Sequence, residues 1–326
     1  MHCLFVNLLD FKIQIQTSKD YMSKEIRISK GLDIRLVGAA ALSITDAIKS
    51  NFYTLRPDDF HGVTPKLAVK AGAKLKAGET VFFDKANEAI KFVTPVSGEI
   101  LEITRGDKRR ILEVKIKADK KISFKTHKTP TLITAQADEI KSLLLESGCW
   151  PFIKQRPYDV IAKPERQPKA IFISAHATAP LAVDYNFTLQ GKEVELQAAV
   201  TALSKLTDGP VHVGVSKTLD SPFKDLQDIC IHKLSGPHPS GNVGTLINKI
   251  DPINKGETVW TIAPQDLVII GELLLTGIYN AERTIAMVGS QIEAPRYLKT
   301  RIGSEVATMI YDRGIQKDVH ARIISG

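Results

Sequence analysis

The sequence has few cysteines and no long apolar run among its 326 residues. Its three cysteines, Cys3, Cys149 and Cys230, are far apart and form no C-x-x-C pair, which argues against a disulfide scaffold and favours a reducing compartment. The densest apolar run, 267–275, is interrupted by a glycine and a glutamate and is far shorter than the roughly 20 residues that cross a bilayer. The sequence therefore predicts no transmembrane segment, and the cytoplasm is the default location.

Motifs of several enzyme classes are also missing. Gly236 and Gly241 have the G-x-x-x-x-G spacing of a phosphate loop, but Asn242 and Val243 stand where a lysine and a hydroxyl residue would hold phosphates and Mg²⁺. No G-x-G-x-x-G follows the apolar run 169–175, so the dinucleotide fingerprint is missing. G-x-S-x-G and H-E-x-x-H are absent too. We therefore expect no catalytic residue and no complete active site in the isolated chain.

The segment GPHPSGNVGT is the strongest candidate for a ligand or partner loop. Glycine and proline punctuate it, and one histidine supplies a polar ring. Such a loop could line a groove or only shape a turn, and the sequence leaves both open. The candidate residues are Gly236, Pro237, His238, Pro239, Gly241, Gly244 and Thr245.

A metal site is a second possibility that the spacing does not favour. The candidate ligands are His176, His212, His232, His238 and Cys230. Cys230 and His232 would share one face of a strand, but no second close pair accompanies them. Structural zinc needs four ligands in clustered spacing, so we expect no metal.

The chain carries a net charge of +8. Its basic residues cluster in the Lys-Arg-Arg triplet at 108–110 and along 115–128. These clusters fit a solvated face, an acidic partner or anionic lipid headgroups. No aromatic platform accompanies them, as a single-strand or RNA binder would need, so we expect no nucleic-acid partner.

Residues 67–106 have the glycine, proline and β-branched pattern of a lipoyl or biotinyl carrier domain. Lys85, in an Asp-Lys-Ala triplet, stands where a carrier's modified lysine would be. A carrier lysine needs the tip of a short hairpin. Ten positions separate Lys85 from Pro95 and residues 87–89 look like part of the turn, so we predict a longer hairpin and an unmodified lysine.

The periodicity of the chain changes three times. The first stretch predicts an all-β barrel or sandwich, because short alternating runs separated by Gly, Pro and Asp occur at 67–70, 79–83, 90–94, 99–103 and 111–116. Residues 134–148 predict an amphipathic helix with a glycine cap, and the proline-rich 150–168 predicts a boundary loop.

The rest of the chain predicts an α/β unit and a small α+β unit. A strand at 169–175, a helix carrying Leu196 and Leu203, and a strand at 211–215 argue for a parallel sheet. Pro264 and Gly277 bracket a helix at 265–276, and strands at 283–288 and 294–298 and a helix from 304 follow. The expected divisions are a disordered extension at 1–22 and domains at 23–130, 131–256 and 257–326.

Seven segments together resemble the A-subunit family of the sodium-translocating NADH:quinone reductases. They are KGLDIRLVGAA (30–40), VKAGAKLKAGETVFFDK (69–85), FVTPVSGEILEITRGDKRR (92–110), ESGCWPFIKQRPYD (146–159), SGPHPSGNVGTLINKIDPI (235–253), ETVWTIAPQDLVIIGELLLTG (257–277) and ERTIAMVGSQIEAPRYLKTRIG (282–303). The resemblance covers nearly everything from Met22 to Gly326, and the segments with GPHPSG and VWTI are highly specific.

The resemblance implies an α/β multidomain fold. Its parts would be a barrel-sandwich-hybrid β domain, a Rossmann-like α/β domain related to the NADH-binding subunit of respiratory complex I, and a small β-grasp domain of the soluble-ligand-binding (SLBB) type. Family members continue beyond the position of Gly326, which implies a C-terminally shortened chain, and residues 1–21 have no family counterpart.

For function, the resemblance implies a cofactor-free, peripheral subunit on the cytoplasmic face of the bacterial inner membrane. It would rest on membrane subunits and take part in quinone reduction, with NADH, flavins, an iron–sulfur centre and ubiquinone used mostly by other subunits. The glycine-rich flavin loop and clustered cysteines of the complex I relative are absent here. Two alternatives stay open: a subunit of the related ferredoxin-dependent ion-pumping complex, and a carrier modified at Lys85.

Overall fold

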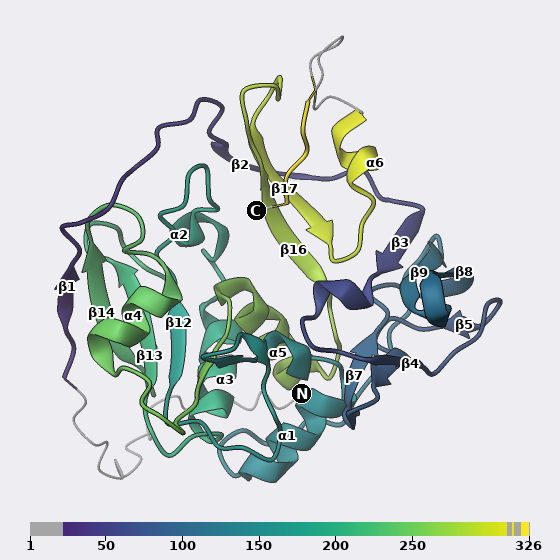
Figure 1. Ribbon diagram of the computed structural model, residues 1–326, viewed down its shortest axis with the longest axis horizontal. Helices are drawn as coiled ribbons and strands as arrows, with labels where there is room; N and C mark the ends of the chain where they lie inside the picture. Colours follow the sequence, from purple (N-terminus) through teal and green to yellow (C-terminus); the bar gives the residue numbers. More distant parts are fainter. Residues whose placement is uncertain (1–21, 312–314, 316–320, 326) are drawn as a thin grey trace, which may run out of the picture.

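The computed structural model describes residues 22–311, 315 and 321–325. Figure 1 shows a sheet flanked by helices on the left, a β unit on the right and a small sheet above them. The extension expected at 1–22 lies outside the described residues, except for Met22. Among the described residues, no helix combines the length and the apolar character that crossing a bilayer requires.

Two small antiparallel sheets form the β unit. One has the order β3 (Phe52–Leu55), β9 (Ile111–Ala118), β8 (Gly98–Arg105) and β5 (Lys74–Leu75), and the other has the order β4 (Pro65–Leu67), β6 (Thr80–Asp84) and β7 (Asn87–Val93). Both sheets contribute to one core, in which the rings of Phe82 and Phe92 stack with centroids 4.6 Å apart. The alternating runs therefore form strands as predicted, although the run at 67–70 contributes only Leu67.

A seven-stranded sheet organises the second region. Its order is β1 (Glu25–Arg27), β14 (Cys230–Ser235), β13 (Val211–Ser216), β12 (Ile171–Ser174), β15 (Val259–Thr261), β10 (Lys154–Arg156) and β11 (Val160–Ile161). The first five strands are parallel, as the strand–helix–strand pattern predicts. The chain runs from β12 through β13 to β14 on one side and then crosses to β15 on the other, so the strand order reverses beside β12.

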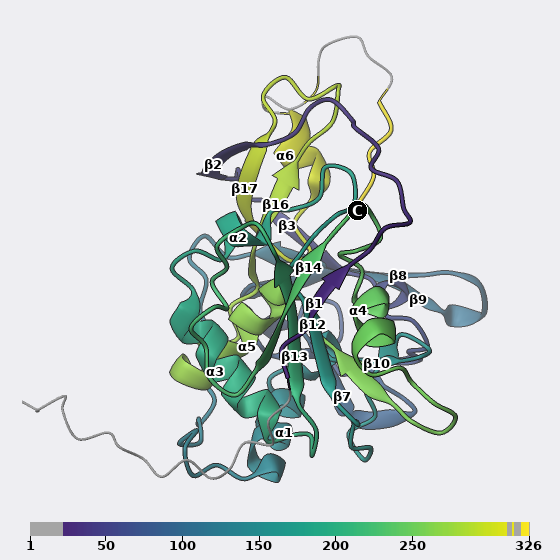
Figure 2. The same cartoon turned by 90° about the vertical axis from the view of Figure 1, so that its left-hand side faces the viewer.

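Helices cover both faces of this sheet, as Figure 2 shows. On one side lie α3 (Glu193–Ser204) and α5 (Pro264–Thr276), with α1 (Ala137–Glu146) near them, and on the other lies α4 (Val243–Ile250). Leu246 and Ile247 of α4 share a buried cluster with Phe172 of β12. The predicted α5 is confirmed: Pro264 occupies its first turn, where no N–H partner is needed, and Gly277 ends it with a φ of +75°.

The stretch 150–168 is not the loop that its prolines predicted. It forms a short helical turn, η3 (Trp150–Phe152), and the two marginal strands β10 and β11. The buried Trp150 indole N–H donates to the carbonyl oxygen of Ala162 at 2.7 Å. Gln155 of β10 lies opposite Trp260 of β15. Little in the sequence indicates these strands, because β10 is polar and followed directly by Pro157, and β11 has only two residues.

The third sheet has the order β16 (Glu282–Met287), β17 (Arg296–Arg301) and β2 (Ala41–Asp46), and α6 (Val306–Tyr311) follows it in the chain. Strands before residue 50 thus enter two other sheets: β1 pairs with β14, and β2 pairs with β17. The strand β15 follows residue 256 but lies in the seven-stranded sheet. The domain boundaries 23–130, 131–256 and 257–326 therefore stay a prediction. In the structure, strands from one of these ranges pair with strands from another.

Candidate functional site

The candidate loop connects β14 to α4 and is closed by its own polar groups. Ser240 is fully buried, and its hydroxyl donates to the Gly236 carbonyl oxygen at 2.8 Å. The N–H of Ser240 donates to the Pro237 carbonyl oxygen at 2.9 Å, and the peptide bond before Pro239 is cis. The loop is therefore a compact turn that uses several of its donors and acceptors internally.

The N-terminal segment lies against this loop. The backbone N–H of His238 donates to the Asp33 carboxylate at 2.9 Å, across a sequence separation of 205 residues. The carbonyl oxygen of His238 accepts from the N–H of Leu32 at 3.0 Å. A Cβ at Gly31 would lie 2.0 Å from that same oxygen, so the close approach of the two segments requires glycine.

The loop is also bonded to the chain that leaves β12. The Ser174 hydroxyl donates to the Gly241 carbonyl oxygen at 2.6 Å, and the Gly241 N–H donates to Thr178 Oγ1 at 3.0 Å. Thr178 Oγ1 lies 3.1 Å from Nδ1 of His238, so a hydroxyl that accepts from one residue can donate to the other. A Cβ at Gly241 would lie 2.0 Å from the His176 carbonyl oxygen. The loop thus fits directly against the carboxyl end of β12.

This position is where an open α/β sheet binds its ligands, outside the carboxyl ends of the strands at the point where strand order reverses. A dinucleotide-binding chain has a glycine-rich turn there and a long helix whose N-terminus holds the pyrophosphate. Here residues 175–184 form a loop, the four-residue helix α2 (Tyr185–Thr188) follows, and α3 begins only at Glu193. The strand β12 therefore lacks the helix N-terminus that binds a pyrophosphate.

The chain after β12 reaches the third sheet instead. The N–H of Asp184 donates to the Tyr297 hydroxyl at 3.2 Å, and the Phe187 and Tyr297 rings have centroids 5.1 Å apart. The Asp184 carboxylate accepts from the N–H of Asn186 at 2.9 Å and caps α2. The segment that carries the phosphate turn in a dinucleotide-binding protein here joins the seven-stranded sheet to β17.

The structure places the seven candidate residues of the loop in two elements. Five of the seven candidates lie in the loop, whereas Gly244 and Thr245 belong to the first turn of α4. His176 lies beside the loop, and burial lowers its pKa. Its Nε2 atom is buried and finds no hydrogen-bond partner among the residues that the structure describes.

Three residues that hold the loop were missed by sequence reasoning. Ser174 and Thr178 had a visible signal, since they flank the polar segment that replaces the dinucleotide fingerprint. Asp33 had none, because no local pattern links it to a residue 205 positions away.

The four candidate histidines lie in two places. His212 of β13 and His232 of β14 are buried on neighbouring strands, with Nδ1 of the first 2.9 Å from Nε2 of the second. His176 and His238 lie at the candidate loop. Within the described part of the chain, no group of three or more His, Cys, Asp or Glu side chains could hold a metal ion.

The hairpin at Lys85 is shorter than the sequence predicted. Asn87 and the two residues after it belong to β7, and Asp84 pairs with Asn87, so Lys85 and Ala86 alone form the turn. The Asp84 carboxylate fixes this turn by accepting from the N–H groups of Thr64 and Ala86 at 3.2 and 3.1 Å. The hairpin is therefore short and Lys85 is exposed, contrary to the predicted long hairpin. We keep the prediction that Lys85 carries no adduct, and an intact-mass measurement checks it.

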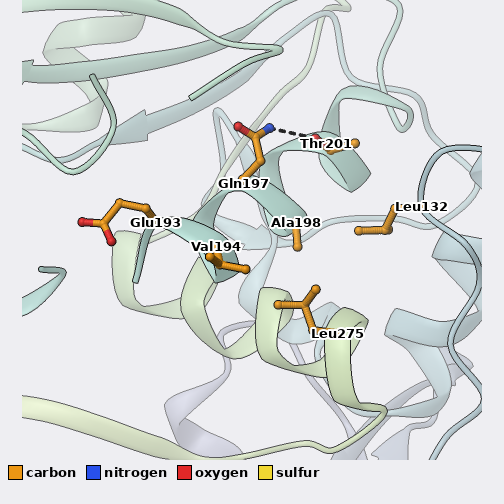
Figure 3. Close-up of a pocket in the computed structure, with 7 residues that line it drawn as sticks. All are labelled: Leu132, Glu193, Val194, Gln197, Ala198, Thr201 and Leu275. Atoms are coloured by element: carbon orange, nitrogen blue, oxygen red, sulfur yellow. Dashed lines mark hydrogen bonds between the residues drawn. The ribbon is translucent and has the colours of Figure 1, made fainter. Parts of the chain in front are cut away.

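An open hollow of about 470 Å³ lies on the outer side of α3 and α5. Figure 3 shows Leu275 of α5 pointing toward Ala198 and Val194 of α3, with a hydrogen bond between Gln197 and Thr201 at its edge. Its surface is mostly apolar, and among the described residues that line it Glu193 is the one ionisable residue. The hollow therefore has the character of a contact surface.

Comparison with known families accounts for most of the chain. Residues 26–119 match the family described as the NqrA N-terminal barrel-sandwich hybrid domain, and residues 135–279 match the NqrA second alpha/beta domain. Residues 284–326 match the NQRA C-terminal domain, whose model is of the SLBB type. The predicted fold class, with its barrel-sandwich, Rossmann-like and SLBB-type parts, is confirmed.

Curated relatives agree with these matches. The A-subunit of the Na(+)-translocating NADH-quinone reductase of Neisseria meningitidis serogroup B is 34% identical over 303 residues, which cover 92% of this chain and 67% of the relative. The protein of that name from Cellvibrio japonicus has the same identity and coverage. The one from Haemophilus influenzae is 34% identical over 307 residues, with 68% of its length covered. The resemblance found in the sequence is thereby confirmed: the chain belongs to the NqrA family of the Na(+)-translocating NADH-quinone reductases.

Proposed function

We propose that this chain is a peripheral, cofactor-free subunit of a Na⁺-pumping NADH:quinone oxidoreductase, on the cytoplasmic face of the bacterial inner membrane. In this role it docks on the membrane subunits and takes part in the quinone-reduction step. NADH, flavins and an iron–sulfur centre are bound by other subunits. The relatives named above supply the complex to which the proposal refers.

The observation that carries the cofactor-free role is the contact between the loop at 236–242 and the carboxyl end of β12. Gly241 donates to Thr178 and accepts from Ser174, so these groups are bonded to the chain itself. A Rossmann-like sheet needs free backbone N–H groups and a helix N-terminus at this place to bind a pyrophosphate. The fold therefore favours a framework role over binding of NADH or FMN.

Calorimetric titration of the purified chain tests this role. We expect no stoichiometric heat with NADH or with FMN. Stoichiometric binding of either one would contradict the cofactor-free role. The variant Thr178→Val removes the hydrogen bond from Gly241 to the segment after β12 and serves as a second sample. New NADH binding in this variant alone would show that the loop itself blocks the place where such a sheet binds its ligand.

Reconstitution of the whole complex tests the quinone step. Membranes that contain the other subunits, with and without this chain, are compared for NADH oxidation by an artificial electron acceptor and by quinone. We expect loss of the chain to abolish quinone reduction and to preserve the artificial reaction. Equal quinone reduction in both samples would contradict the proposal.

The two alternatives from the sequence are less well supported. The relatives reported above are named for NADH and quinone, and the three separated cysteines of the sequence offer no cluster of the kind that a ferredoxin-linked subunit carries. The short, exposed turn at Lys85 favours a carrier more than the sequence suggested. An adduct on Lys85 in the intact-mass measurement would revive that second function.

A further inference from the structure

The β8–β9 hairpin ends in a strained and strongly basic turn. Figure 2 shows this hairpin extending beyond the rest of the chain. The hairpin tip, defined here as residues 105–110, contains three arginines, one lysine and one aspartate, and all five of these charged side chains are exposed. The tip therefore carries an excess of three positive charges.

Two of the four cations at the hairpin tip are committed to the fold. The Arg105 guanidinium donates to the Arg109 carbonyl oxygen at 2.9 Å. Arg110 forms an ion pair with Asp58. The side chains of Lys108 and Arg109 make no ion pair or hydrogen bond with any residue that the structure describes, so their charges face solvent.

The backbone at these two residues has an unfavourable, left-handed conformation. Lys108 has φ +52° and Arg109 has φ +60°, so two successive residues with bulky side chains are left-handed. The N–H of Arg110 donates to the Asp107 carbonyl oxygen at 3.1 Å, which closes a two-residue hairpin turn. Asn-Gly is the sequence that such a turn favours. Backbone strain at an exposed tip is typical of a segment whose side chains have a function.

The residues around the tip indicate what kind of surface it meets. Leu112 and Leu101 are exposed aliphatic side chains on the same hairpin, with 36% and 48% of their surface accessible. The hairpin from 98 to 118 has no aromatic residue on which a nucleobase could stack. Flexible cations on a hairpin that also exposes aliphatic side chains fit a lipid surface, where charged heads meet phosphates and stems meet acyl chains.

We propose that the hairpin tip is a docking surface for the headgroups of anionic phospholipids, with Lys108 and Arg109 as the two contacting cations. The inference rests on the proposed peripheral location at a membrane, and it adds a direct contact with lipid to the contact with membrane subunits. Attraction to an anionic leaflet is worth about a factor of five in partition for each cation near the surface. Removal of both charges should therefore weaken partition of the chain onto anionic vesicles about 25-fold.

Co-sedimentation of the full chain with vesicles tests the contact. We compare phosphatidylcholine vesicles with vesicles in which a third of the lipid is phosphatidylglycerol, at low and at high salt. The tip variant is Lys108→Gln with Arg109→Gln. The matched control is Lys120→Gln with Lys121→Gln, which makes the same charge change in an exposed segment after β9, at the other end of the hairpin.

We expect the native chain and the control to bind the anionic vesicles in a salt-sensitive manner, and the tip variant to bind about 25-fold more weakly. Equal losses in both variants, equal binding to both kinds of vesicle, or no vesicle binding by the native chain would overturn the inference. Co-purification with the membrane subunits is measured in parallel. A tip variant that fails to assemble while vesicle binding is unchanged would identify an acidic protein partner and overturn the lipid contact alone.

Discussion

The imidazole rings of His212 and His232 share a hydrogen bond of 2.9 Å between Nδ1 of the first and Nε2 of the second. The backbone N–H of Lys24 donates to Nδ1 of His232 at 3.1 Å, so His232 accepts there and donates through Nε2. His212 then accepts at Nδ1. Both rings are therefore neutral, and their bond joins β13 and β14 while His232 anchors the start of β1.

This pair predicts acid-sensitive stability. Burial lowers the pKa of His212 to about 3, helped by His232 and Lys24, and burial and Lys24 lower the pKa of His232 to about 4. An unfolded histidine has a pKa of about 6.5. Below that value the unfolded chain binds more protons than the folded chain, so the free energy of unfolding decreases as the pH falls from about 6.5 toward 4, and further toward 3.

Urea denaturation at several pH values measures this slope. Tryptophan fluorescence is a suitable probe, because the two tryptophans of the sequence are buried: Trp260 lies in β15 of the seven-stranded sheet, and the ring of Trp150 contacts it. The double variant His212→Leu, His232→Leu should flatten the slope, whatever its absolute stability. His61→Gln removes an exposed histidine and is the control. An unchanged slope in the double variant would show that His212 and His232 do not cause the acid sensitivity.

Two glycines close to each other in sequence should respond in opposite ways to alanine. Gly241→Ala places a Cβ 2.0 Å from the backbone carbonyl oxygen of His176, so the loop must move and its bonds to Ser174 and Thr178 weaken. A loss of about 1–3 kcal/mol in the free energy of unfolding is expected. Gly244→Ala has no atom within 4 Å of the new Cβ and lies in α4, so it should stabilise by about 0.5–1 kcal/mol. Denaturation midpoints of the two variants measure this difference in sign, and two equal shifts would show that the loop is not packed as described.

A buried ion pair joins α5 to β16. The carboxylate of Asp266, a residue that is 8% exposed, pairs with the Arg283 guanidinium. Burial raises the pKa of Asp266, although Arg283 acts in the opposite direction. Asp266→Ala leaves a partly buried cation without its partner and should cost about 3–5 kcal/mol.

The double variant Asp266→Ala, Arg283→Ala completes a mutant cycle. Its cost should be smaller than the sum of the two single costs, because the second change removes the unpaired charge. Simple additivity in the denaturation data would mean that the two side chains do not interact.

The hairpin tip predicts a stabilising substitution. Replacing Lys108 by Asn and Arg109 by Gly supplies the residues that a two-residue turn with positive φ favours. The strain of two residues with long side chains in the left-handed backbone conformation is then relieved. We expect a gain of about 1–2 kcal/mol in the stability of the β unit, measured by hydrogen exchange of the β8 and β9 amides. The control Lys108→Gln, Arg109→Gln removes the same charges and keeps the strain. A gain of equal size in the control would assign the effect to charge repulsion.

Local signals in the sequence predicted several elements well. The helix α5 was predicted within one residue, because Pro264 and Gly277 mark its ends whatever surrounds them. The strands β12 and β13 followed from two apolar runs with a helical pattern between them. The strands β10 and β11 were missed. The residues of β10 are polar, Pro157 follows it directly and its partner β15 lies about 100 positions later, while β11 is only two residues long.

The sequence by itself determined the family, the β character of residues 67–116 and the ends of α5, because these depend on local patterns of apolar residues, prolines and glycines. Only the tertiary structure decided where β1 and β2 pair, and that Asp33 and Thr178 hold the loop around His238. The tertiary structure also shows that the turn at Lys85 has two residues, where the sequence predicted a longer one. Pairing between distant segments depends on how whole sheets pack, and no local pattern of the chain records that.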